Sequence, residues 1–279
     1  MSQHVGIPDS GHIFNSIRFQ PSHLATLFLH VSETTKVLAP TMTTPTTKVF
    51  AKTRIRQAEP KDVDAVRTTM VTSLASDAMW RYRYRFREEY PDDHLKYSRL
   101  FIELLISEAC PDFLALVLEV EEDSSWNIAA LSIWDISYEN RRIYAAKGEN
   151  YVAPTANEAM EAAGASTRKD KDPIYDAVFL KRFSEARNSF VEMFHGNDMY
   201  LFLLCTHPRY WRRGYATQLL RWGIERSERD DAPITLSATP MGEPTYLACG
   251  FEELERVDVI VEGDYRKEVL VNMAYRPKK

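Results

Sequence analysis

Several features are absent from this 279-residue sequence, and each absence excludes a class of protein. No apolar run approaches the roughly 20 residues that a membrane helix needs, and the nearest candidate, residues 24–31, is too short. The formal net charge of −5 gives no general attraction to nucleic acid or to an anionic membrane. A phosphate-binding P-loop is also missing. We therefore expect neither a membrane protein nor a nucleic-acid-binding protein.

Cysteine is scarce as well, with only Cys110, Cys205 and Cys249 in the chain. Their number is odd and their spacings match no zinc pattern, so the sequence predicts no bound metal. We expect reduced cysteines that pack as small apolar residues. Such cysteines indicate a reducing setting, and we expect a cytoplasmic protein.

The composition divides the chain into two parts. Residues 1–47 contain few charges and a Pro- and Thr-rich run at 39–47, which predicts a disordered N-terminal extension without a secretory signal. Residues 48–279 are expected to form one globular domain. Residues 137–196 interrupt its pattern as an insertion, in which 176–194 read as a helix with an aromatic stripe. Such an insertion either packs its stripe on the sheet or covers a binding site as a lid, and both can hold together.

The order of the expected elements indicates a mixed α/β (α+β) fold. The sheet should be largely antiparallel, with about six to seven strands and helices on both faces. A right-handed crossover would make the strands at 199–206 and 234–238 parallel. The other expected strands are 53–58, the hairpin 113–118 and 128–136, and the closing pair 251–261 and 267–275.

The segment 206–220 is the most informative part of the sequence. An apolar run at 199–205 predicts a buried strand before it, and the apolar spacing of 216–224 predicts a helix after it. The turn between them contains Arg212, Arg213 and Gly214. The free N–H groups and the positive dipole end at the start of a helix favour a phosphate. The pattern therefore predicts a strand–turn–helix cradle for a pyrophosphate.

Two motifs in this half of the chain resemble those of the GNAT family of N-acetyltransferases. Trp211-Arg-Arg-Gly214-Tyr-Ala216 is similar to the family pattern Arg/Gln-x-x-Gly-x-Gly/Ala, although Trp replaces the first polar residue. Tyr246-Leu-Ala-Cys-Gly250-Phe251 is similar to Tyr-x-x-x-Gly-Phe. We identify the chain as resembling the fungal-type small-molecule branch of this family. The resemblance implies the GNAT fold and acetyl-CoA as the co-substrate.

The resemblance also assigns the residues that contact acetyl-CoA. In the family, the two parallel strands splay apart, and pantetheine binds the unpaired backbone much as an added strand would. The pantetheine contacts fall on the backbone of Leu204, Cys205 and Thr206. The pyrophosphate contacts fall on Arg212, Arg213, Gly214, Tyr215, Ala216 and Thr217.

Direct acetyl transfer to an amine needs a base, a stabilised oxyanion and an acid for the leaving thiolate. By resemblance, Tyr246 is the acid. The general base remains open: Asp135, at the end of a strand, is our first candidate, with His207 and Glu192 as alternatives. The aromatic residues of 80–87 are candidate substrate contacts, namely Trp80, Tyr82, Tyr84 and Phe86.

These observations lead to one expected function and two alternatives. We expect an acetyl-CoA-dependent N-acetyltransferase that acts directly on a primary amine, chiefly of a small molecule. The alternatives are a non-catalytic acyl-CoA-binding regulatory module and a protein or peptide N-acetyltransferase. The His-x-x-x-Asp centre of other CoA-dependent acyltransferases is absent. The sequence does not reveal the oligomeric state.

Overall fold

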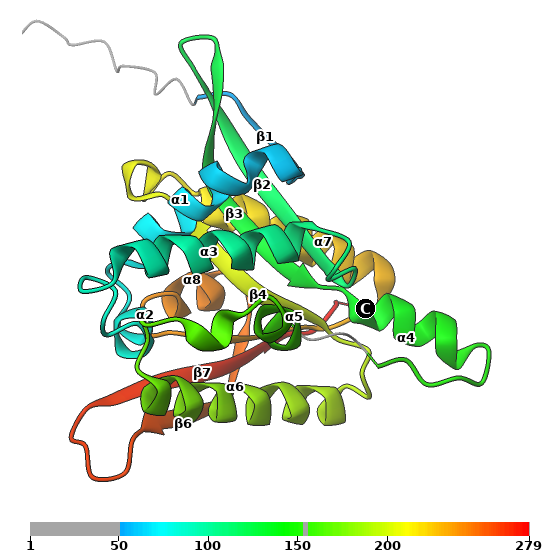
Figure 1. Cartoon of the computed structure of the whole chain (residues 1–279). Helices are drawn as coiled ribbons and strands as arrows, with labels where there is room; N and C mark the ends of the chain where they lie inside the picture. The colour runs from blue at the N-terminus through cyan, green and yellow to red at the C-terminus, as the bar shows by residue number, and fades with distance from the viewer. Residues whose placement is uncertain (1–50, 153–155, 279) are drawn as a thin grey trace, which may run out of the picture. The chain divides into compact units, whose positions relative to one another are not determined.

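The computed structural model describes residues 51–152 and 156–278, and Figure 1 shows their arrangement. The expectations for residues 1–47 lie outside this part. The described residues contain a seven-stranded sheet with the order β1-β2-β3-β4-β5-β7-β6, antiparallel except between β4 and β5. The predicted mixed, largely antiparallel sheet is thus confirmed. The strands are β1 (Thr53–Gln57), β2 (Phe113–Glu122), β3 (Ser125–Asp135), β4 (Met199–Thr206), β5 (Ile234–Ala238), β6 (Glu252–Ile260) and β7 (Lys267–Tyr275).

Helices cover both faces of the sheet. Apolar residues of α1 and α3 form one core with β2, β3 and β4, while α7 packs on the opposite face. Helix α6 packs aromatic residues against Tyr200 and Phe202 of β4. The helices are α1 (Val63–Leu74), α2 (Ala78–Arg83), α3 (Pro91–Ile106), α4 (Ser137–Ala145), α5 (Ala156–Ala162), α6 (Pro173–Met193), α7 (Tyr215–Asp230) and α8 (Glu243–Ala248), with short 3-10 turns at Pro60–Asp62, Ala165–Thr167 and Pro208–Tyr210.

The central hairpin is buried on both faces, as its continuous apolar runs predict. In β2, Val117 belongs to the core under α1 and α3, whereas its neighbour Leu118 belongs to the core under α7. In β3, Ile133 and Trp134 divide in the same way. This two-sided burial explains why the strands do not show a simple alternation of apolar and polar residues.

Three helices extend the prediction from sequence. Residues 78–83 form the short helix α2, and Asp77 caps its start by accepting a hydrogen bond from the Trp80 N–H. Helix α3 begins at Pro91, and Asp92 lies in its first turn. Helix α4 was missed because only Ser137 and Tyr138 of its nine residues are buried, which leaves almost no apolar pattern to read.

Candidate active site

Strands β4 and β5 separate after a short paired stretch. They pair only at Met199–Ile234 and Tyr200–Thr235, and the rest of β4 has no paired strand on that side among the described residues. The register of β4 against β3 shifts between Ile133 and Trp134, which leaves Phe202 as an extra, bulged residue. The sheet therefore contains an open gap between the carboxyl halves of its two parallel strands.

The peptide groups of Leu204 and Thr206 point toward this gap. The His207 N–H donates to the Ala129 carbonyl at 2.9 Å, which fixes the side of β4 that faces β3. Because hydrogen bonding alternates along an antiparallel pair, Cys205 faces β3 and its two neighbours face away from it. The geometry thus favours the backbone of Leu204 and Thr206 as partners for a ligand, and not that of Cys205.

Two side chains form hydrogen bonds with the carboxyl end of β4. The Thr206 carbonyl accepts hydrogen bonds from Ser73 Oγ at 2.5 Å and from Trp211 Nε1 at 2.6 Å. Trp211, which stands where the family has Arg or Gln, therefore anchors the turn to the strand end. The N–H of Thr206 and both backbone groups of Leu204 are left for the gap.

The turn before α7 has the geometry of an anion cradle. Arg212 and Gly214 adopt left-handed conformations, with φ of 62° and 79°. Within the described residues, no backbone hydrogen bond uses an N–H of 212–217 as donor, and the first helical bond runs from Gln218 to Gly214. Arg212 and Arg213 are exposed and form no salt bridge with a described carboxylate. Free N–H groups at the start of a helix, with two adjacent guanidinium groups, suit a pyrophosphate.

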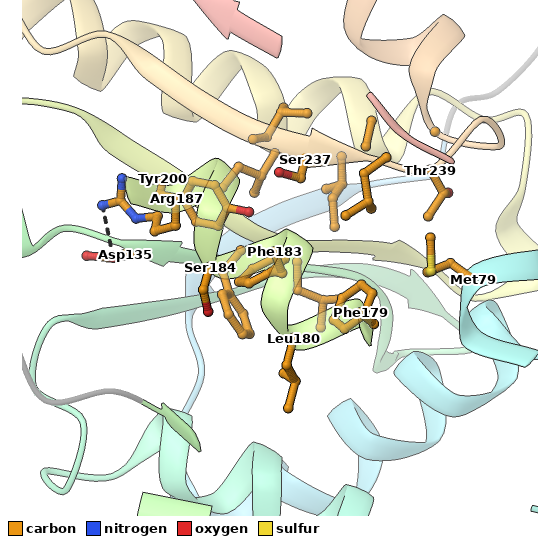
Figure 2. Close-up of a pocket in the computed structure, with 18 of the residues that line it drawn as sticks. Met79, Asp135, Phe179, Leu180, Phe183, Ser184, Arg187, Tyr200, Ser237 and Thr239 are labelled. Carbon is orange, nitrogen blue, oxygen red and sulfur yellow. Dashed lines mark hydrogen bonds and ion pairs between the residues drawn. The ribbon is translucent and has the colours of Figure 1, made fainter. Parts of the chain in front are cut away.

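A cavity of about 670 Å³ adjoins the gap (Figure 2). Residues from α1, α2, α6, β4, β5 and α8 form its walls, and most of them are apolar. Of the predicted aromatic contacts, Trp80 and Tyr84 line the cavity, whereas Tyr82 packs against Tyr175 and Phe86 lies outside the lining. The larger aromatic contribution comes from residues outside 80–87, namely Phe101, Phe113, Phe179, Phe183, Tyr200 and Phe202. Of these, Phe179 and Phe183 belong to the aromatic stripe of the helix expected at 176–194.

Tyr246 lies in the wall of this cavity on α8. Its side chain is almost fully buried, and burial, with a smaller contribution from Cys205, raises the pKa of its hydroxyl. The hydroxyl is therefore protonated at neutral pH and can donate a proton. Burial also raises the pKa of the Cys205 thiol, so this cysteine is a poor nucleophile.

Asp135 lines the other end of the cavity, where Arg187 lies 3.3 Å from its carboxylate. Arg187 also binds the buried Asp198 at 2.6 Å, so Asp135 is one member of a charged cluster. The two alternative bases lie outside the cavity lining: Glu192 is exposed, and His207 Nδ1 accepts a hydrogen bond from the Arg209 N–H.

Two polar residues of the cavity were missed from the sequence. Tyr200 lies beside Ser237, and burial raises the pKa of its hydroxyl to about 12. Asp77 lines the wall next to α2. An Asp three residues before Trp80 is a helix-capping signal that could have located α2, but no local pattern shows that its carboxylate faces a cavity.

The described residues contain no group of three or more His, Cys, Asp or Glu side chains that could hold a metal ion. None of the described helices is long and apolar enough to cross a membrane.

Comparison with known proteins agrees with this geometry. Residues 154–263 match the family model described as "Acetyltransferase (GNAT) domain". A curated protein named "Acetyltransferase", from the fungus Stachybotrys chartarum, is 24% identical over 217 residues, which cover 76% of this chain and 86% of that protein.

Similar solved structures include a histone acetyltransferase HPA2 and related acetyltransferase from Corynebacterium glutamicum, at 19% identity and a TM-score of 0.46, covering 81% of this chain and 97% of that one. Another is the PaiA N-acetyltransferase from Thermoplasma acidophilum in complex with coenzyme A, at 14% identity and a TM-score of 0.43, covering 81% and 99%.

Residues 154–263 are thus similar to a GNAT acetyltransferase domain, and the mixed seven-stranded sheet is the arrangement expected for that fold. The chain is an N-acetyltransferase that uses acetyl-CoA as its acetyl donor.

Proposed function

We propose that this enzyme transfers the acetyl group of acetyl-CoA directly to a primary amine of a small molecule with an apolar body, as expected for the fungal-type small-molecule branch. One observation carries the proposal: a single cavity is lined both by the open gap and by the aromatic wall of α6. Leu204 and Ser237 line it from the two separating strands, and Phe179 and Phe183 line it from α6. A donor in the gap and an acceptor against α6 would share one space.

Acetyl-CoA would bind by backbone contacts and positive charge. Pantetheine would pair with the free backbone groups of Leu204 and Thr206, and the thiol end would reach into the cavity. The pyrophosphate would lie on the N–H groups of residues 212–217. Most of these contacts come from the backbone, so a family member can replace the first motif residue with Trp211 and keep the site.

Transfer would proceed without a covalent enzyme intermediate. The amine loses a proton, its nitrogen attacks the acetyl carbonyl carbon, and the carbon–sulfur bond then breaks. Tyr246 gives its proton to the leaving thiolate and regains one from the nitrogen. Asp135 remains a candidate base for an acceptor amine that lies at its end of the cavity.

The shape of the cavity favours a small acceptor over a protein. Its volume lies within the roughly 300–1,000 Å³ of small-molecule sites. Helices α2 and α6 are tied together by an ion pair between Arg83 and Asp176 at 2.9 Å, and Arg83 also stacks on Phe179. We propose that the insertion 137–196 covers the acceptor site in this way, which favours a small acceptor over an extended peptide.

A thiol-release screen tests the function. Purified enzyme and acetyl-CoA are incubated with polyamines, aryl amines, amino acids and peptides, beside the Tyr246→Phe variant. We expect turnover with an amine of apolar body and a loss of about 100-fold or more in the variant, since a positioned acid contributes roughly 10²–10⁴-fold. Acetyl-CoA affinity should stay nearly unchanged. Binding without thiol release across the panel would favour the non-catalytic module, and undiminished turnover of the variant would remove Tyr246 from the mechanism.

A further inference from the structure

Asp77 is a buried carboxylate on the cavity wall without a cationic partner. Only 3% of the residue is exposed. Its Oδ1 accepts a hydrogen bond from the Trp80 N–H at 2.9 Å, and its Oδ2 accepts one from Thr239 Oγ1 at 2.7 Å. Both donors are neutral, and no Lys, Arg or His in the described part of the chain lies within ion-pair distance. The start of the six-residue helix α2 offsets only part of this charge. Because a buried charge is costly without a counterion, a cationic ligand would be stabilised here.

Asp77 lies next to the β4–β5 gap, in which acetyl-CoA is proposed to bind. It bonds to Thr239, which directly follows β5, while Ser73, four residues earlier, bonds to the Thr206 carbonyl at the end of β4. The segment 73–77 therefore reaches both sides of the gap. In Figure 2, Thr239 and Met79 lie at the opposite end of the cavity from Asp135.

The charges around the cavity also favour a cation near Asp77. Burial raises the pKa of Glu268 on β7, and the negative charge of Asp77 raises it further, so two acidic groups lie near each other at this end. Arg81 lowers the same pKa, but it is not part of the cavity lining. The three basic residues of the lining are engaged elsewhere. They are Arg83, paired with Asp176; Arg141, which donates to the Gly196 carbonyl; and Arg187, paired with Asp135 and Asp198.

The other two carboxylates of the lining are less suited to this role. Asp135 lies opposite Tyr200 in the sheet, four residues before Leu204, which corresponds to about 13 Å along a strand. Asp112 accepts hydrogen bonds from Asn140 and Tyr151 and lies at the same distant end, where its carbonyl accepts from the N–H of residue 136. Neither is close to the part of β4 that faces the gap.

We propose that Asp77 binds the ammonium group of the acceptor, and that the acceptor is an amine that is cationic at neutral pH and carries an apolar or aromatic body. The body lies against the aromatic wall formed by Phe179, Phe183 and Phe202, and the ammonium group lies at the β4–β5 gap. This assignment rests on the proposed function, since a cation held there meets an acetyl group only when acetyl-CoA fills the gap.

The test separates binding from transfer. With CoA in place of acetyl-CoA no transfer occurs, so calorimetry can compare 2-phenylethylammonium with 2-phenylethanol, which has the same body and no charge. We expect the wild-type protein to prefer the ammonium by about 10- to 100-fold, as for hydrogen bonds to charged groups. Asp77→Asn should lose this preference, because the asparagine Oδ1 keeps the helix cap and its NH2 group can donate to the Thr239 hydroxyl, while the charge is removed.

Asp112→Asn is the matched control, since it removes an equally buried carboxylate of the same cavity and should keep the preference. In acetylation assays, Asp77→Asn should raise KM about 10- to 100-fold with a smaller change in kcat. Thermal unfolding and CoA binding verify that each variant is folded. The inference is overturned if the wild-type protein shows no preference for the ammonium, or if Asp77→Asn retains it while Asp135→Asn loses it.

The two proposals can fail separately. Selective ammonium binding that depends on Asp77, without acetyl transfer to any amine, would refute the proposed function and leave the binding site intact. If Asp77→Asn acetylates amines as efficiently as the wild type, the Asp77 binding site is refuted and the proposed function stands.

Discussion

Replacing Gly223 with alanine should destabilise the protein, although alanine is the better helix former. Gly223 lies on the buried face of α7. A Cβ atom there would lie 2.2 Å from Cη2 and 2.6 Å from Cζ2 of Trp134. Trp134 is fully buried, and its Nε1 donates to Ser132 Oγ at 2.9 Å. The indole ring therefore cannot move away without disturbing the core.

The two opposing effects differ in size. Alanine gains about 1 kcal/mol in helix propensity. Overpacking costs about 1–3 kcal/mol, occasionally more, and losing the Trp134 hydrogen bond would add about 1 kcal/mol. We expect a net destabilisation of about 1–3 kcal/mol, with a lower Tm by about 2–4 °C for each kcal/mol. Because α7 carries the N–H groups of the cradle, a displaced helix should also bind acetyl-CoA less tightly.

Urea unfolding of Gly223→Ala, Trp134→Phe and the double variant provides the measurement. Phenylalanine lacks the outermost ring atoms of the indole, so the double variant should be more stable than the sum of the two single changes predicts. A Gly223→Ala protein as stable as the wild type would refute this reasoning.

Two further predictions concern the cradle and acid stability. Gly214→Ala should lower the free energy of unfolding by about 1–2 kcal/mol, because φ is 79° at this position. Only the backbone conformation opposes the change, since no atom lies within 4 Å of the new Cβ. Calorimetry should show weaker acetyl-CoA binding, and unchanged affinity would contradict the cradle geometry. Burial would raise the pKa of Asp170, but hydrogen bonds from His94 and Arg168 lower it to about 2. Since this folded-state pKa lies below the unfolded value of about 3.9, the stabilisation is present above pH ~4 and is lost as pH falls toward 2. Asp170→Asn should therefore lose less unfolding free energy than the wild type between pH 4 and pH 2 in urea titrations. An equal loss in the two proteins would show that this carboxylate does not contribute to acid stability.

Elements with a strong local pattern were predicted well. The bounds of β5 and β7 agree with the expected strands 234–238 and 267–275, and α7 contains the whole stretch 216–224 whose apolar spacing predicted a helix. Periodicity and the Gly214 turn are local signals, so neighbouring residues alone contain them. Helix α4 and the role of Asp77 depend instead on contacts with residues far along the chain.

The sequence by itself determined the strand–turn–helix cradle, since a glycine, two arginines and a helix start within a few residues create an anion site in any such turn. It also determined the sheet class through the periodicity of its strands. Only the tertiary structure decided that the aromatic face of α6 becomes the wall of a cavity. It also decided that Asp135 pairs with Arg187, 52 residues away, while Asp77 has no cationic partner among the residues that the structure describes. Burial and charge pairing depend on which distant segments meet, and no local pattern records that.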